Sequence, residues 1–287
     1  MMLLRDAPRA VVVQRIGRES PGYPAGLAEL RDDPPQLFVR GRLPAAGTPA
    51  VAIVGSRAAT PYGRAFATRI ARDLAARGVA VVSGLAHGID AAAHEGALAA
   101  AGITLGVLAS GVRQVTPAGH ELLAERVCER GALVSEQEDG PPFGRGAFVK
   151  RNRIVAALAD AVVVVEASER SGALSTADVA RRLGRPLFAV PGDVDRVMSQ
   201  GTLALLRGGA RVCADAGDVL AVLPKPAVDA SDPDARLLAA LSGSPCTLEV
   251  LAAAAGVTAP DALARLLRLQ WSGLAVGMPG GRWSTRA

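Results

Sequence analysis

A chain of 287 residues, half of them hydrophobic, is long enough for one large domain and a small second one. Its formal net charge of +5 suits a polyanionic partner. The sequence has no run of about 18 uncharged apolar residues, no recognisable signal-peptide cleavage site and only three widely spaced cysteines, which argues against a membrane span, secretion and a disulfide framework. We therefore expect a cytoplasmic protein without a membrane partner.

The large domain is predicted to occupy residues 50–223, after a short N-terminal segment at residues 1–49 that Pro and Gly interrupt. Within residues 50–223, apolar runs rich in Val and Ile alternate with stretches whose apolar residues recur every three or four positions. This alternation predicts an α/β domain with a mostly parallel sheet and helices on both faces. Ligands bind such sheets at the carboxyl ends of the strands, so we look for the site in the loops there.

A small domain is predicted at residues 234–287, behind a linker rich in Pro, Asp and Ser at residues 224–233. Three short helical stretches followed by a glycine-rich hairpin are typical of a winged helix. The third helix carries Arg265 and Arg268, whose spacing of three suits a secondary DNA-reading face. The domain is only weakly basic, and a role in dimerisation or protein contact explains the pattern equally well.

The first strand of the large domain leads into Gly55, Ser56 and Arg57. Small residues let the backbone approach an anion, and the arginine can clamp a phosphate with two parallel hydrogen bonds. A tight turn with a solvated arginine would explain the same residues.

The second loop opens with Ser83 and Gly84 and resembles a glycine loop that cradles phosphate. It lacks the signatures of a P-loop and of a dinucleotide-binding fold. We expect structural or solvent-facing roles for His87 and His94, and we expect Asp90 to stabilise the start of a helix.

Cations dominate a third segment, in which Phe148 is followed by Lys150, Arg151, Asn152 and Arg153. Such cations can neutralise phosphates while the aromatic ring stacks on a base. The alternatives are a solvated helix face for the charges and core packing for the ring.

Two later loops complete the series. Ser171 and Gly172 precede a helix and suit an anion-accepting terminus, although helix capping alone would explain the serine. A further strand ends at residues 191–193, and residues 199–202 open the next helix. No motif shows a nucleophile with its base, a paired-carboxylate catalyst or metal-ligand spacing. We therefore expect no catalytic residues, no metal and no cofactor, and we predict that the protein is not an enzyme.

Taken together, these segments resemble the DNA processing protein A (DprA/Smf) family over about residues 50–222. The motifs that carry the resemblance follow one another in the order VAIVGSR, VVSGLAHGIDAAAHEGAL, FVKRNRIVAAL, VVVVEASERSGALSTADVA, FAVPGDV and SQGTLALLRGGA. The chain departs from the family at His87, where arginine is frequent, and at His120, where asparagine is usual. Its N-terminal region is also shorter than a full sterile-alpha-motif-like domain.

The resemblance implies an extended Rossmann-like domain and a homodimer. It also implies that the protein binds single-stranded DNA without sequence preference, protects it and loads a RecA-type recombinase onto it, as in natural transformation. By position, it implies that Arg57, Lys150 and Arg153 hold phosphates and that Phe148 stacks on a base. It also implies that the amide N–H groups of the glycines and serines in the loops donate to a phosphate.

Two other functions remain open. A nucleotide phosphoribohydrolase on a related scaffold would carry a PGGxGTxxE motif, whereas this chain has PGDVDRVMSQGTLALL, without the second glycine or the glutamate. A nucleotide-binding module could hold one small phosphorylated molecule in the same loops, but it needs fewer cations than residues 150–153 supply.

Overall fold

The computed structural model of the chain describes residues 12–20, 22–32, 36–140, 144, 146–224, 233–241, 245–271 and 274–285. It contains two compact units, Met1–Pro224 and Lys225–Ala287. The predicted linker at residues 224–233 lies, except for its two end residues, outside the described part of the chain.

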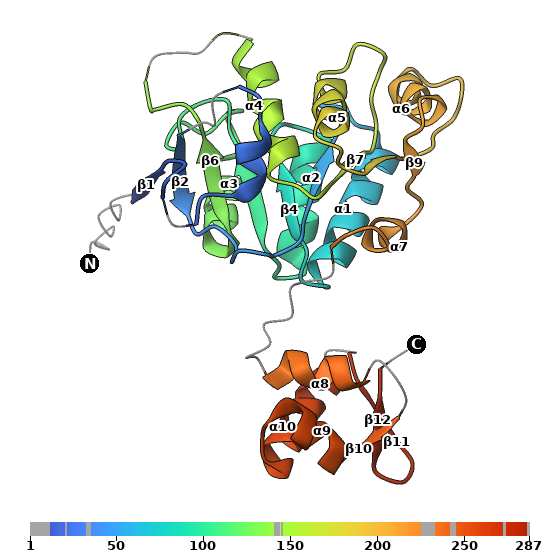
Figure 1. Ribbon diagram of the computed structural model, residues 1–287. Coiled ribbons are helices and arrows are strands. Elements are labelled where there is room, and N and C mark those ends of the chain that lie inside the picture. The colour runs from blue at the N-terminus through green and yellow to red at the C-terminus, as the bar shows by residue number, and fades with distance from the viewer. Residues whose placement is uncertain are drawn as a thin grey trace, which may run out of the picture. The chain divides into compact units, whose positions relative to one another are not determined.

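The large unit is built on a sheet of nine strands among the described residues, in the order β1-β2-β6-β5-β4-β3-β7-β8-β9 (Figure 1). The pairs from β6 through to β9 are parallel. The strands are β1 (Val13–Ile16), β2 (Leu37–Gly41), β3 (Ala50–Val54), β4 (Ala80–Ser83), β5 (Thr104–Val107), β6 (Ala132–Ser135), β7 (Ala161–Val164), β8 (Leu187–Ala189) and β9 (Arg211–Val212). The predicted mostly parallel sheet is confirmed.

The N-terminal segment contributes to this sheet, which the sequence pattern did not indicate. Strand β2 pairs antiparallel with β6, and β1 pairs antiparallel with β2. Leu37 and Val39 alternate along β2 and are both buried, so one face of the strand completes the core beside β6. Residues 37–41 are therefore part of the large unit's sheet.

Helices cover both faces of the sheet, so the parallel strands are buried on both sides. One face packs against α1 (Pro61–Ala75), α2 (Ile89–Ala99), α3 (Glu121–Arg130) and α7 (Ala216–Leu220). The other face packs against the 3-10 helix η1 (Ala25–Glu29), α4 (Gly146–Ala157), α5 (Ala173–Arg182) and α6 (Val197–Arg207). Strand β3 has β4 on one side and β7 on the other, so the chain changes direction across the sheet at this strand.

The small unit has the predicted three helices and hairpin: α8 (Pro233–Leu241), α9 (Leu248–Ala255), α10 (Ala259–Trp271), and a sheet in the order β10-β12-β11. Its strands are β10 (Cys246–Thr247), β11 (Val276–Met278) and β12 (Arg282–Ser284). Its core joins Leu237, Leu251, Leu266 and Trp283. Within the described ranges, no single helix combines the length and apolar character needed to cross a membrane; the pair α9 and α10, bent by 98°, meets both criteria only together.

His94 of α2 is fully buried against β4 and β5, and its protonation state follows from its partners. The Thr104 hydroxyl donates to the carbonyl oxygen of Val81, so the His94 Nδ1–H must donate to Thr104 Oγ1, 2.7 Å away. Its Nε2 is buried without a hydrogen-bond partner among the described residues. Burial, together with the charges of Arg151 and His120, lowers the pKa of His94 from 6.5 to about 3.

The depressed pKa of His94 predicts a pH-dependent stability. Between pH 3 and 6.5 the unfolded chain binds a proton that the folded chain does not, so the free energy of unfolding falls as the pH is lowered. The contribution is about 1.4 kcal/mol per pH unit inside that window. Urea unfolding across this window should show a steeper slope for the wild type than for His94→Leu. Equal slopes would contradict the assignment.

Candidate functional site

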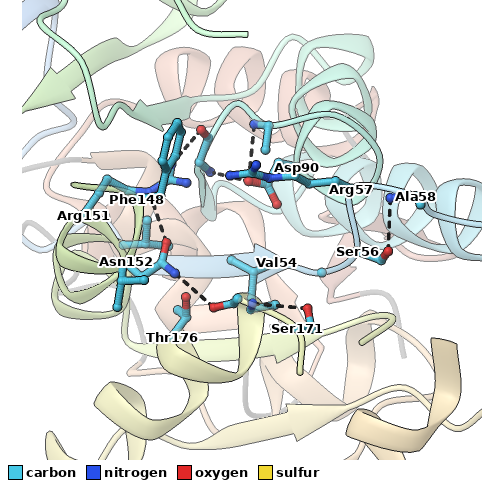
Figure 2. Close-up of a pocket in the computed structure, with 17 residues that line it drawn as sticks. Val54, Ser56, Arg57, Ala58, Asp90, Phe148, Arg151, Asn152, Ser171 and Thr176 are labelled. Carbon is cyan, nitrogen blue, oxygen red and sulfur yellow. Dashed lines mark hydrogen bonds between the residues drawn. The ribbon is translucent and has the colours of Figure 1, made fainter. Parts of the chain in front are cut away.

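A cleft of about 750 Å³ opens where β3, β4 and β7 end, at the strand where the chain changes direction (Figure 2). This is the place where open α/β sheets bind ligands. The cleft is lined by Val54, Gly55, Ser56, Arg57, Ala58, Gly84, Ala86, Asp90, Phe148, Val149, Arg151, Asn152, Val155, Ser171, Gly172, Ala173 and Thr176. Of the predicted site residues in the large domain, all except Ser83, Lys150 and Arg153 are thus brought together.

The side chains of the predicted cationic segment on α4 lie in two different environments. Phe148, Arg151, Asn152 and Val155 follow the spacing of one helix face and line the cleft. Lys150 and Arg153 do not line it.

Instead, Lys150 and Arg153 both pair with Glu136, which follows β6. The Lys150 Nζ lies 3.5 Å from the carboxylate, and the Arg153 side chain is mostly buried against it. Neither side chain lines the cleft, and their predicted contacts to phosphates stay a prediction. Their charges are balanced, at least in part, by a carboxylate that lies far from them in the sequence.

Arg151 is buried and forms the floor of the cleft. Its Nη1 donates to the carbonyl oxygens of Gly84, at 2.6 Å, and Val107. Its Nε donates to Asn152 Oδ1 at 3.1 Å. A Cβ at Gly84 would clash with the guanidinium, so this glycine is required to make room for Arg151.

Asp90 is the buried counter-charge of Arg151. Its carboxylate accepts the amide N–H groups of Gly84, at 3.1 Å, and Ala86, at 3.4 Å. Burial raises the pKa of Asp90, and the charge of Arg151 opposes that rise. Asp90 thus fixes the loop after β4, a role beyond the helix-start charge that was expected.

The exposed guanidinium of Arg57 lies over the ring of Phe148, with its Cζ 4.9 Å from the ring centroid. Both residues line the cleft, and Figure 2 shows them approaching each other from the loop after β3 and from α4. The predicted phosphate clamp and the predicted base-stacking ring therefore form one cation–π pair.

Three loop residues that are predicted to contact phosphate have polar groups with partners inside the protein. The Ser56 amide donates to the carbonyl oxygen of Glu166 at 2.7 Å. Ser83 is fully buried, and its hydroxyl donates to the carbonyl oxygen of Ile53 at 2.6 Å. The Gly84 amide donates to the carboxylate of Asp90. The phosphate contacts of these residues stay a prediction.

Ser171 and Gly172 lie on the α5 side of the cleft. The Ser171 hydroxyl accepts the Ala173 amide at 3.3 Å, a helix-capping contact. The Gly172 carbonyl oxygen accepts from Asn152 Nδ2 at 3.0 Å, which ties α4 to the start of α5. Sequence reasoning missed Thr176, although a spacing of four from Gly172 along a helix would have placed it on the same face.

In the small unit, the guanidinium of Arg265 donates hydrogen bonds to two carboxylates of the same unit. Its Nη1 donates to Asp234 at 2.7 Å and its Nε to Asp261 at 3.0 Å. These two carboxylates would compete with DNA for its guanidinium, and its DNA-reading role stays a prediction. Arg268 is exposed. Leu267 and Trp271 are exposed on the same helix, so the outer surface of α10 is largely apolar.

No three His, Cys, Asp or Glu side chains among the described residues are grouped so that they could hold a metal ion. The donors that face the cleft are instead guanidinium, amide and hydroxyl groups.

A family model described as DNA recombination-mediator protein A matches residues 14–224 of this chain. The chain belongs to the DprA family. A second model, the DprA winged helix domain, matches residues 221–281, so the small unit has the predicted winged-helix identity. The predicted family resemblance and fold class are confirmed.

Three relatives illustrate the likeness. A DNA processing protein, DprA, of Mycobacterium tuberculosis is 43% identical over 248 residues, covering 82% of this chain and 64% of the relative. The chain thus spans less than two thirds of that relative's length. The X-ray structure of DprA from Streptococcus pneumoniae has a TM-score of 0.70 and 34% identity, covering 76% of each chain. The structure of DprA from Helicobacter pylori, a protein with a single-stranded-DNA-binding mode, has a TM-score of 0.65 and 29% identity, covering 74% of this chain and 95% of the other.

Because Arg151 and Asp90 are buried oppositely charged groups, we expect their contributions to the free energy of unfolding to be coupled. Arg151→Met leaves a buried carboxylate without its counter-charge and should lower the free energy of unfolding by about 3–5 kcal/mol. Adding Asp90→Asn should recover part of that loss, which a double-mutant cycle by urea unfolding would measure. Additive effects of the two substitutions would show that the residues do not act as a pair.

The small unit contains both tryptophans of the chain, Trp271 and Trp283, so tryptophan fluorescence reports its unfolding. Arg265→Ala removes the contacts to Asp234 and Asp261 and should lower the melting temperature of this unit by a few degrees. The affinity for single-stranded DNA should change less than twofold. A large loss of affinity with unchanged melting would instead support the DNA-reading role of Arg265.

Proposed function

We propose that the chain binds single-stranded DNA in the cleft at the ends of β3, β4 and β7. The observation that carries the proposal is the exposed guanidinium of Arg57 over the Phe148 ring, at the mouth of a cleft whose floor holds the buried guanidinium of Arg151. The single-stranded-DNA-binding mode of the H. pylori relative supports the same assignment.

In this proposal Arg57 donates two parallel hydrogen bonds to a backbone phosphate, while the ring of Phe148 stacks on a neighbouring base. Neither contact reads a base edge, so the cleft accepts any sequence. Gly55, Asn152, Ser171 and Gly172 shape its remaining walls. Lys150, which is 58% exposed, adds charge outside the cleft.

The proposed activity is that of a recombination mediator. Single strands held by a homodimer are protected and passed to a RecA-type recombinase in the cytoplasm. The chain then acts by binding and not by catalysis, in keeping with the description of its family as a recombination mediator. The nucleotide phosphoribohydrolase alternative is not favoured, because the PGD loop lacks the glutamate that such an enzyme needs.

Arg57→Ala should weaken binding of single-stranded oligo-dT by about 10–100-fold, because a charge-assisted contact to a phosphate is lost. The slope of log K against the logarithm of the salt concentration should also become shallower by about one, which corresponds to the loss of one phosphate contact. Arg72→Ala is a control for the loss of one positive charge, since Arg72 lies in the last turn of α1, pairs with Asp73 and does not line the cleft. Fluorescence anisotropy at several salt concentrations measures both quantities.

Equal affinities of Arg57→Ala and wild type, or no preference for single over double strands, would contradict the proposed site. The same variants should be compared in recombinase loading, followed as ATP hydrolysis by a RecA-type recombinase on single strands coated with single-strand-binding protein. Arg57→Ala should abolish the stimulation, and sedimentation should show a dimer for both forms. A monomer that still stimulates the recombinase would contradict the homodimer.

A further inference from the structure

Helix α10, the last of the three helices of the small unit (Figure 1), carries an exposed apolar stripe. Leu263, Leu267 and Trp271 follow one another at intervals of four residues and are 38%, 48% and 92% exposed. Pro260 and Ala264 are also exposed and extend the same side of the helix. Exposed apolar residues that are contiguous mark an interaction site, whereas scattered ones need no explanation.

The opposite side of α10 already supplies the contacts that the fold of the small unit needs. Ala262, Leu266 and Leu269 are buried there, in the same core as Leu237 and Trp283. The exposed stripe lies on the other side of the helix and adds nothing to that core. A helix that is apolar on both sides is typically buried on both sides, so the stripe indicates a partner.

The chemistry of the stripe favours a protein over nucleic acid as this partner. In helix-turn-helix proteins the corresponding helix enters the major groove and contacts base edges and phosphates with polar and cationic side chains. Leu263 and Leu267, in the middle of the exposed side, have no polar group for either contact. The ring of Trp271 beside them is of the kind that is enriched in the centres of protein interfaces.

Two opposite charges lie along one border of the stripe. Asp261 and Arg268 are seven residues apart, which is about two helical turns, so both project from the same side of α10. Asp261 accepts from Arg265 Nε at 3.0 Å, but its side chain is 46% exposed, and a carboxylate can accept further donors. The other border of the stripe carries the uncharged Gln270.

This placement of charge makes the stripe complementary to itself in one orientation. In an antiparallel pair of α10 helices whose two-fold axis passes between Leu263 and Leu267, Leu263 of each copy faces Leu267 of the other. The charged borders then lie on the same side of the pair, and Asp261 of each copy comes within reach of Arg268 of the other. A parallel pair would instead place the charged border of one helix against the uncharged border of the other. The dipoles of the two helices also favour the antiparallel pair.

We propose that α10 is an interface between two copies of this chain, in which the stripes pack antiparallel and Asp261 of each copy pairs with Arg268 of the other. A standard interface buries about 800 Å² per partner, and one side of a helix of this length offers roughly half of that. The pairing is therefore weak between separate molecules and gains strength where one DNA strand or a second interface already holds the copies close together. It uses none of the residues that line the cleft, so it stands independently of the proposed DNA site.

Charge reversal in the full chain tests the antiparallel pairing. Asp261→Arg and Arg268→Asp each place like charges opposite one another at both ends of the pair, and each should weaken self-association about tenfold. An equimolar mixture of the two variants should recover it, because opposite charges then meet at both ends. The double variant Asp261→Arg/Arg268→Asp should recover it as well. Glu249→Arg, which reverses one exposed charge on α9, is the matched control and should associate like wild type.

Trp271 reports the contact directly, because it is 92% exposed whereas Trp283, the other tryptophan, is 8% exposed. In concentrated wild type, acrylamide should quench the fluorescence about twofold less than in Leu267→Asp, whose stripe carries a charge. Sedimentation of the same samples separates the two sources of the second copy. A mass that rises with protein concentration in wild type alone indicates pairing between separate assemblies, and an equal mass in both indicates pairing inside one assembly.

Equal quenching of wild type and Leu267→Asp would overturn the interface. Single charge variants whose mixture stays as weak as either alone would overturn the antiparallel pairing. Asp261→Arg also loses the contact to Arg265, so Leu267→Asp, which keeps that contact, decides on the interface if Asp261→Arg unfolds the small unit.

A loss of affinity for oligo-dT in Leu267→Asp, with quenching equal to that of wild type, would assign the stripe to nucleic acid and overturn the proposal. If wild type binds no single strand but its Trp271 is protected, the proposed function fails and the interface stands.

Discussion

The buried guanidinium of Arg151 ties together the parts that form the cleft. It joins the loop after β4, the last residue of β5 and helix α4, and it lies near the buried Asp90 at the start of α2. A buried charge is stable only where its hydrogen bonds and counter-charge are supplied, so these segments must adopt one arrangement. The positions of Phe148 and Asn152, on the same helix face, follow from it. The cleft is therefore organised before a ligand arrives, which lowers the cost of binding.

Few of the residues that line the cleft are charged. Of the cations at residues 150–153, only Arg151 lines the cleft, and it is close to Asp90. Lys150 and Arg153 pair with Glu136 outside it. Arg57 thus remains as the exposed cation among the lining residues, resting on an aromatic face. Such a surface suits a partner that is held by one phosphate and one stacked ring at a time, and not by a broad cationic patch.

Much of the fold and part of the site could be predicted from the sequence. The alternation of apolar runs was enough for the parallel sheet, and the rule that parallel sheets bind ligands at strand ends was enough to gather Gly55, Arg57, Phe148 and Gly172. The direction in which α4 presents Lys150 and Arg153 could not be predicted, because it depends on Glu136, which lies in a separate loop. The contact between Arg265 and Asp234 could not be predicted for the same reason, since Asp234 belongs to another helix. Strand β2 was not predicted, because its apolar face is buried only through its pairing with β6, which is distant in the sequence.

The edge of the sheet at β9 bears on how copies of this chain can associate. Strand β9 is two residues long and both of them are exposed, so it offers few unpaired backbone groups to a neighbouring sheet. Joining two sheets by strand addition at this edge would gain little hydrogen bonding. Association there has to rely on side-chain contacts, and the symmetry of those contacts would decide between a closed set of subunits and an open-ended fibre.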